Sequence, residues 1–153
     1  LRRDLSGFRR KKRAPMPEAK AARIALSSPS EVRFIYEWSN GELGLPICPA
    51  RSTDVYGAYL RWCRINGEQR PRPSNQFHGA VARLPGWDKK KARVNKETVG
   101  GVESVPTPLI MPPESLVPDH LRYREGSDQT AWHTHCATTF ADGVKDSVLK
   151  AAA

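Results

Sequence analysis

The sequence predicts a mainly α-helical protein with a small β-hairpin, arranged as a winged helix-turn-helix with a basic N-terminal arm and an additional C-terminal helix. Two amphipathic helical patterns are separated by a proline-broken turn, and a lysine run precedes a double glycine set among valines. A hydrophobic content of 39% in 153 residues suffices for one core. We expect a basic arm at 1–27, the winged domain at 28–105, a proline-rich linker at 106–126 and the C-terminal helix at 127–150.

The first core helix is expected at about 30–40. Val32, Ile35 and Tyr36 recur near helical spacing, and Ser28 or Ser30 can cap the start of the helix. The apolar segment GLPICPA that follows is short and bounded by prolines. It is therefore either a loop or a very short edge strand.

A stronger helix follows, with Ser52 or Thr53 as its cap, and the turn EQRPRP ends the helical stretch because its two prolines remove backbone donors. Ser74 then starts a short third helix. Its outward side carries amide, imidazole and guanidinium groups, which can donate to and accept from base edges. The apolar residues that anchor these helices are Val55, Tyr59, Trp62 and Cys63 in the second, and Phe77, Val81 and Leu84 in the third.

The last third of the chain predicts three further elements. Residues 87–105 surround Gly100-Gly101 with valines, which predicts a basic hairpin. The segment PTPLIMPPESLVP is expected to be an extended linker. Ser127 then caps a long helix whose apolar stripe either folds back on the domain or pairs with another chain. The stripe comprises Trp132, Cys136, Phe140, Val144 and Val148.

Positive charge is concentrated in two segments of a chain whose formal net charge is +9: residues 1–13 carry +6 and residues 51–96 carry +8. Clustered cations attract polyanions, so DNA is the expected partner. The residues expected to contact phosphates are Arg70, Arg72, Lys89, Lys90, Lys91 and Arg93. Those expected to face the bases, from the third helix, are Asn75, Gln76, His78 and Arg83.

No catalytic, metal or cofactor site is expected. The three cysteines are far apart and lack CxxC spacing, so packed thiols in a reducing cytosol are expected rather than disulfides or a zinc site. In WHTHC, His133 and His135 point to different sides of a helix. There is no GxxxxGK[ST] motif for a nucleotide, and no apolar run approaches the length of a membrane span.

Three segments carry a family resemblance: LRRDLSGF, DVYGAYLRWCRINGE and SNQFHGAVARLPGW. They resemble the C-terminal part of phage and plasmid primase-helicases of the poxvirus-like superfamily 3 group, over about residues 1–87. Val55 stands where leucine is commoner, and the hairpin and last helix match loosely. The "LYxAYxxWCxxxG" helix of that family is matched by Val55, Tyr56, Ala58, Tyr59, Trp62, Cys63 and Gly67, and its next helix by Phe77 and Leu84.

The resemblance implies a winged helix that binds origin or template DNA beside a hexameric ATP-dependent helicase, in the cytoplasm of a bacterial host. Because the chain begins at Leu1, we expect a non-catalytic fragment of a longer polypeptide, with the arm as the end of the helicase domain. The alternative is an interaction module that recruits another replication protein or joins subunits. The lysines and arginines between residues 70 and 96 favour DNA. A cryptic nuclease is a third reading.

Overall fold

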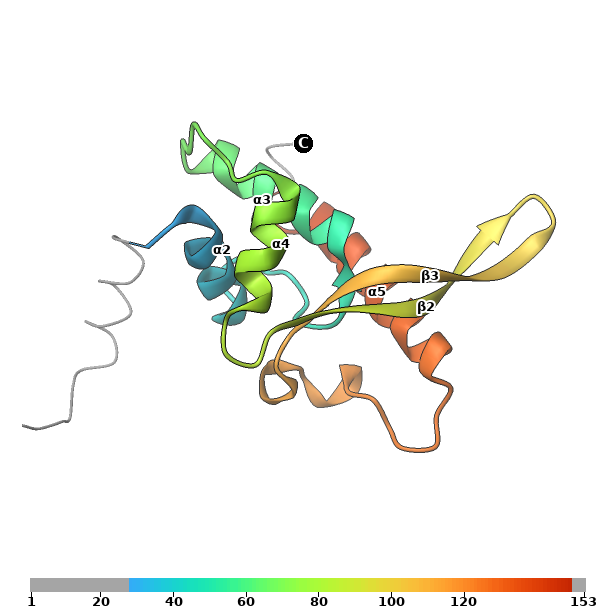
Figure 1. The fold of residues 1–153 in the computed structure, drawn as a ribbon. Coiled ribbons are helices and arrows are strands. Elements are labelled where there is room, and N and C mark those ends of the chain that lie inside the picture. Colours follow the sequence, from blue (N-terminus) through green and yellow to red (C-terminus); the bar gives the residue numbers. More distant parts are fainter. Residues whose placement is uncertain (1–27, 150–153) are drawn as a thin grey trace, which may run out of the picture.

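The computed structural model describes residues 28–149, so the basic arm at 1–27 lies outside the described residues. The described part is mixed α/β, with four α-helices and a three-stranded antiparallel sheet from which a long hairpin projects (Figure 1). Its elements are helix α2 (Ser30–Ser39), strand β1 (Ala50–Arg51), helices α3 (Ser52–Ile65) and α4 (Ser74–Ala82), strands β2 (Asp88–Thr98) and β3 (Gly101–Met111), the 3-10 turns Glu114–Leu116 and Asp119–Leu121, and helix α5 (Gln129–Lys145).

The sheet has the strand order β1-β3-β2. Strands β2 and β3 pair along their whole length, from Asp88 with Met111 to Thr98 with Gly101. Strand β1 pairs only through its two residues, with Ile110 and Leu109 of β3. The segment GLPICPA therefore leads into a two-residue edge strand, one of the two outcomes that the sequence allowed.

The prediction of a linker at 106–126 is corrected by strand β3, because the first six residues of the predicted linker, 106–111, belong to this strand. Pro106 and Pro108 are tolerated because alternate residues of a strand direct their backbone N–H positions to the same edge. That edge of β3 is paired by β1 only opposite Leu109 and Ile110, so the two missing donors leave no ladder bond broken.

Aromatic residues of α2, α3 and α4 meet around Phe34, which is completely buried. Its ring centroid lies between 5.8 and 6.2 Å from those of Trp38, Tyr59, Trp62 and Phe77. The predicted apolar stripe of α3 is buried as expected. The three helices therefore share one aromatic core, and α4 is held by it on one side only.

The predicted helix caps are wrong for α2 and α3, which begin after Pro29 and Arg51 without a side-chain cap. Ser30, one of the expected caps, instead shares a 2.7 Å hydrogen bond with the Tyr59 hydroxyl. At α5 the cap is Asp128 rather than Ser127: its carboxylate accepts from the backbone N–H groups of Thr130 and Ala131 at 2.9 and 3.3 Å.

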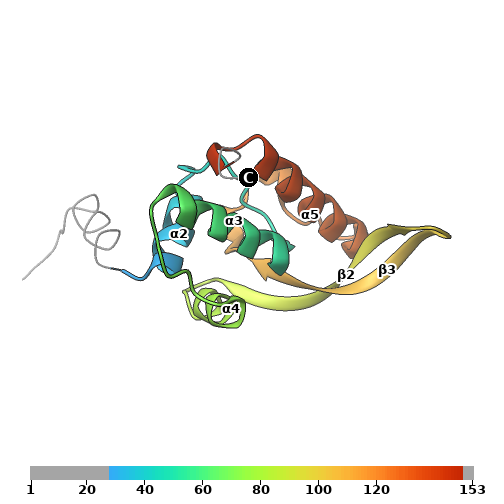
Figure 2. The same cartoon turned by 90° about the horizontal axis from the view of Figure 1, so that it is seen from above.

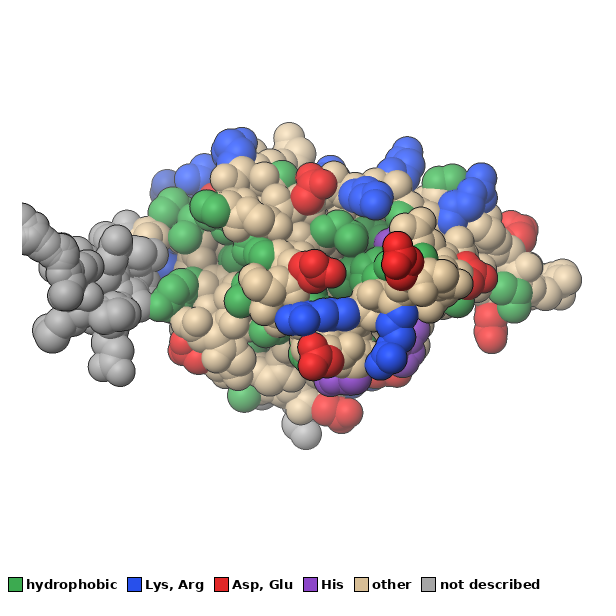
Figure 3. Space-filling model, turned by 90° about the horizontal axis from the view of Figure 1, so that it is seen from below, with side chains coloured by type: hydrophobic (Ala, Val, Ile, Leu, Met, Phe, Trp, Pro, Cys, Tyr) green, Lys and Arg blue, Asp and Glu red, His purple; other side chains and the backbone are tan. Residues whose placement is uncertain are grey.

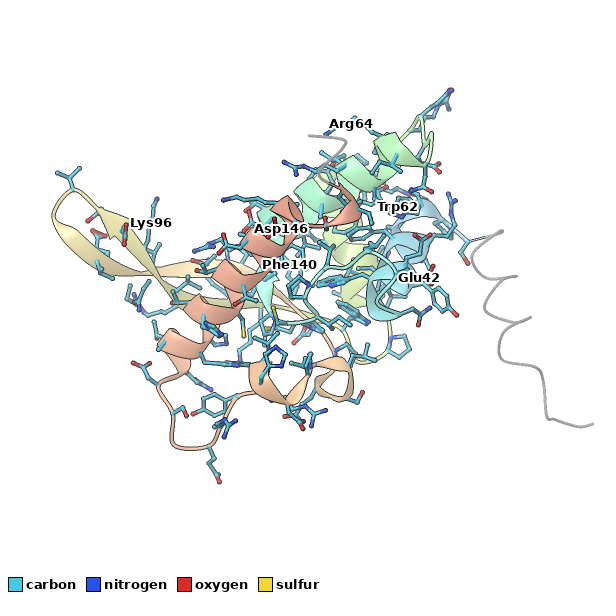
Figure 4. All side chains as sticks on the ribbon, turned by 180° about the vertical axis from the view of Figure 1, so that it is seen from behind. Glu42, Trp62, Arg64, Lys96, Phe140 and Asp146 are labelled. Carbon is cyan, nitrogen blue, oxygen red and sulfur yellow. The ribbon has the colours of Figure 1, made fainter. Side chains whose placement is uncertain are left out.

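Helix α5 folds back on the domain. Phe140 stands midway along α5 (Figure 4), with its ring centroid 5.2 Å from that of Trp38, and the backbone N–H of Asn95 in β2 donates to Thr134 Oγ1 at 2.8 Å. Val148 departs from the predicted stripe because it is 59% exposed, and Leu149 is buried in its place. The predicted stripe from Trp132 to Val144 is thus covered within the chain.

The cysteines behave as predicted, because all three are free and buried. Within the described residues, no helix combines the length and apolar character that crossing a membrane requires.

Candidate nucleic-acid interface

The turn between α3 and α4 is tied to α3 by two tyrosine hydroxyls. The backbone N–H of Arg72 donates to the Tyr59 hydroxyl at 2.9 Å, and the Tyr56 hydroxyl donates to the carbonyl of Arg72 at 2.8 Å. Burial raises the pKa of Tyr59 to about 12, so this phenol stays neutral. The basic turn is therefore fixed at Arg72 rather than free to move.

Helix α4 is oriented by its buried side. The ring of Phe77 stacks on Tyr59 at a centroid distance of 4.5 Å, and Val81 is fully buried. His78 is also buried, and its Nε2 lies 3.0 Å from the carbonyl oxygen of Ser52, which can only accept. This corrects the prediction that His78 faces bases: its imidazole joins α4 to α3.

The outward side of α4 carries the other predicted base-facing residues, Asn75, Gln76 and Arg83, all exposed. They line a hollow together with Gly79. The Arg83 guanidinium lies over this glycine, with Nη1 only 3.5 Å from where a Cβ would stand. A helix with amide and guanidinium groups around a residue that lacks a side chain can approach another surface closely.

An acidic residue that the sequence analysis missed forms part of this hollow. Glu31 of α2 is 94% buried at its side chain, and its Oε2 lies 3.1 Å from Arg72 Nε. Arg72 Nη1 also donates to Gln76 Oε1 at 3.3 Å. Glu31 Oε1 has no hydrogen-bond partner within the part of the chain that the structure describes. No sequence pattern links Glu31 to a residue 41 positions away, so only the fold reveals the pair.

The predicted phosphate contacts in β2 divide between the two faces of the hairpin, because side chains alternate along a strand. Lys89, Lys91 and Arg93 share one face, and Lys90 belongs to the other. Burial lowers the pKa of His78 in α4, and nearby Lys89 lowers it further. Burial and Lys90 do the same to His133 in α5. Lys89 therefore lies on the α4 side of the hairpin and Lys90 on the α5 side.

Helices α4 and α5 lie on different sides of the hairpin (Figure 2). The exposed polar and basic residues on the α4 side are named here the α4 surface. It comprises Arg70, Arg72, Asn75, Gln76, Arg83, Lys89, Lys91 and Arg93. Nine of the ten predicted contact residues are exposed, but only these eight belong together, since Lys90 is on the other side and His78 is buried.

The hairpin tip differs from its base. Val99 is fully exposed and Val102 is 67% exposed, and the acidic residues Glu97 and Glu103 flank them. Seen from below, lysine and arginine side chains lie along the upper edge and in the middle of the face, and acidic side chains are spread over the face and also lie near the projecting tip (Figure 3). Lys89, Lys90 and Lys91 thus lie at the helix end of the hairpin, whereas the tip carries exposed valines and two glutamates beside Lys96.

Among residues 28–149, no three histidine, cysteine, aspartate or glutamate residues are grouped so that they could hold a metal ion. In the WHTHC segment, His133 is buried and His135 is exposed, which agrees with the different directions expected from their spacing. No protein-family model, curated protein or solved structure matches this chain.

Proposed function

We propose that this chain is a non-catalytic DNA-binding module of the winged helix-turn-helix class. The observation that carries the proposal is the α4 surface, where a short helix exposes amide and guanidinium groups beside three cations on one face of a hairpin. The element order helix, strand, helix, helix, hairpin and the sheet order β1-β3-β2 support the class.

The α4 surface suggests a division of roles. Helix α4 has nine residues, about 14 Å of helix, and a helix diameter of about 10–12 Å fits a major groove about 12 Å wide. Asn75, Gln76 and Arg83 would then face base edges. Arg70, Lys89, Lys91 and Arg93 would contact phosphates, which fix the register without recognising sequence. Lys90 and His78 have no part in this arrangement.

The parent protein that we propose is a phage or plasmid primase-helicase, on the resemblance of its motif residues. Six of the seven residues that match the "LYxAYxxWCxxxG" helix lie in α3, and all of these except Tyr56 are buried core residues. They support membership of a fold family more than a particular DNA contact. The DNA that such a module contacts would be origin or template DNA in the cytoplasm of a bacterial host.

A second candidate is an interaction module for another replication protein, and the hairpin tip favours it. Val99 and Val102 offer apolar contact area, and Glu97 and Glu103 would repel a phosphate backbone. The two functions use different surfaces, so they can be tested separately.

Fluorescence anisotropy with labelled duplex and single-stranded DNA at two or more salt concentrations tests the proposal. We expect duplex binding whose log affinity falls with log salt at a slope of about −4, from about four phosphate contacts. Replacing Val99 and Val102 together by serine should leave this binding unchanged. A wild-type chain that binds neither DNA at low salt would exclude the DNA-binding function and leave the interaction module.

A further inference from the structure

Among the cations of the α4 surface, Arg72 has its guanidinium paired with a buried carboxylate. Its Nε is paired with Glu31, its Nη1 donates to Gln76, and its backbone N–H and carbonyl are bound by two tyrosine hydroxyls. The side chain is nevertheless 48% exposed. Lys89 and Lys91, by contrast, form no ion pair with any described residue. Arg72 is thus presented in one fixed orientation.

A guanidinium fixed beside a carboxylate suits a base better than a phosphate. The Arg72–Glu31 pair has no net charge, and a phosphate placed on Arg72 would stand close to the buried carboxylate. Phosphate contacts depend mainly on charge, which mobile lysines supply. Base contacts depend on orientation: the planar fork of an arginine matches the O6 and N7 acceptors of guanine in the major groove.

Glu31 has features of a positioning residue rather than of a stabilising one. A buried carboxylate with one oxygen lacking a hydrogen-bond partner is unfavourable for folding, and its single ion pair offsets only part of the desolvation. What the pair does achieve is a defined direction for Arg72 at the edge of the hollow formed by Asn75, Gly79 and Arg83.

We propose that Arg72 recognises a guanine base through the major groove and that Glu31 positions it, an inference that rests on the proposed DNA-binding function. The sequence had placed Arg72 among the phosphate contacts. We assign it to the base-recognising group, because its guanidinium is paired with Glu31 and donates to Gln76 of α4.

The test is selection of bound duplexes from a randomised library by the wild-type chain and by Arg72→Lys, Glu31→Gln and Lys91→Ala. The wild-type chain should select a guanine at one position. Arg72→Lys keeps the charge and loses the fork, so its preference for that guanine should fall by about 5- to 150-fold. Glu31→Gln should lose part of the same preference without weakening binding to other sequences. Lys91→Ala should weaken binding to all sequences alike.

A second measurement changes the DNA instead of the protein sequence. Replacing the selected guanine by 7-deazaguanine removes the N7 acceptor, and this should weaken binding of the wild-type chain but not of Arg72→Lys. An unchanged guanine preference in Arg72→Lys, or insensitivity of the wild-type chain to 7-deazaguanine, would overturn the inference. Duplex binding without any guanine preference would overturn it alone, whereas no duplex binding at all would also overturn the proposed function.

Discussion

The two faces of the β2–β3 hairpin begin alike and end differently. Each face has a lysine beside a buried histidine: Lys89 near His78 of α4, and Lys90 near His133 of α5. In both histidines burial is the main cause of the lowered pKa. The basic run that supplies these lysines is continuous in sequence, and the strand distributes it to two environments.

Toward the hairpin tip the two faces diverge. On the α4 side, Lys91 and Arg93 remain exposed, and Arg93 Nη1 donates to the carbonyl of Ser104 at 2.9 Å, which holds it along the sheet. On the α5 side, Val94 and Leu109 are fully buried. One face therefore continues the polar surface of a helix, and the other serves as a packing surface. A count of charges in the sequence cannot make this distinction, because it depends on what covers each face.

The largest expected effect on stability comes from weakening the packing of helix α5 against the rest of the chain. Phe140→Ala should lower the free energy of unfolding by about 3–5 kcal/mol, because it removes a fully buried ring that packs on Trp38. Val148→Ala, at an exposed position near the end of the chain, is the control and should change it by less than about 0.5 kcal/mol. Chemical denaturation followed by tryptophan fluorescence measures both. Equal effects would mean that α5 does not secure this face.

Removing matched charges from the two faces should affect DNA binding unequally. The double variant Lys89→Ala, Lys91→Ala should make the salt slope less steep by about 2 and weaken binding by roughly 10- to 60-fold at 0.1 M salt. The double variant Lys90→Ala, Lys96→Ala removes the same amount of charge from the α5 side, and it should change the salt slope and the affinity little. Lys96 is on the projecting part of the hairpin (Figure 4). Anisotropy titrations at several salt concentrations make the comparison, and identical slopes would refute the assignment of faces.

The two buried histidines should make the fold sensitive to acid. Both pKa values are lowered in the folded protein, so the unfolded chain takes up more protons as the pH falls below about 6.5. Their contribution to stability is fully present above that pH and is lost as the pH falls through the folded pKa. We expect the free energy of unfolding to decrease as the pH falls below about 6.5.

Single variants separate the contributions of His78 and His133 to the pH dependence of stability. His78→Gln and His133→Gln should each flatten the stability profile between pH 7 and 5, measured by urea denaturation in a series of buffers. If neither variant changes the profile, the two histidines do not determine the loss of stability in acid.

Much of the fold is predictable from local patterns. The apolar spacing of α3 and α4, the prolines between them and the double glycine of the hairpin indicated the right elements in the right order. The cap of α2 was not predictable, because the hydroxyl of Ser30 is bonded to Tyr59 of another helix. The length of β3 was missed since prolines in a segment argue against a strand unless the edge that they leave unpaired is known.

The candidate site divides in the same way. The exposure of Asn75, Gln76 and Arg83 follows from helical spacing. The burial of His78 does not, because it depends on the contact with Ser52 of another helix. The separation of Lys90 from its neighbours was predictable in principle, because a strand alternates with a period of two. Glu31 was not, because its relation to Arg72 exists only in the folded chain.

A small gain in stability is expected at two helical glycines, of which only Gly79 lines the hollow beside Arg72. Gly79 of α4 and Gly57 of α3 both have room for a Cβ: the closest atom at Gly79 is Arg83 Nη1 at 3.5 Å, and nothing lies within 4 Å at Gly57. Alanine at either position should raise the free energy of unfolding by about 0.5–1 kcal/mol, because glycine is a poor helix former. Only Gly79→Ala places a methyl group in the middle of the α4 surface.

Alanine at Gly79 should therefore raise stability and lower DNA affinity, whereas alanine at Gly57 should raise stability and leave DNA affinity unchanged. A groove that approaches the α4 backbone would meet the new methyl group, so Gly79→Ala should bind duplex DNA more weakly although it is the more stable protein. Thermal unfolding and anisotropy on the same samples give both quantities. If Gly79→Ala binds as well as Gly57→Ala, the DNA does not come close to the middle of α4, and the hairpin face with Lys89, Lys91 and Arg93 would have to account for the binding.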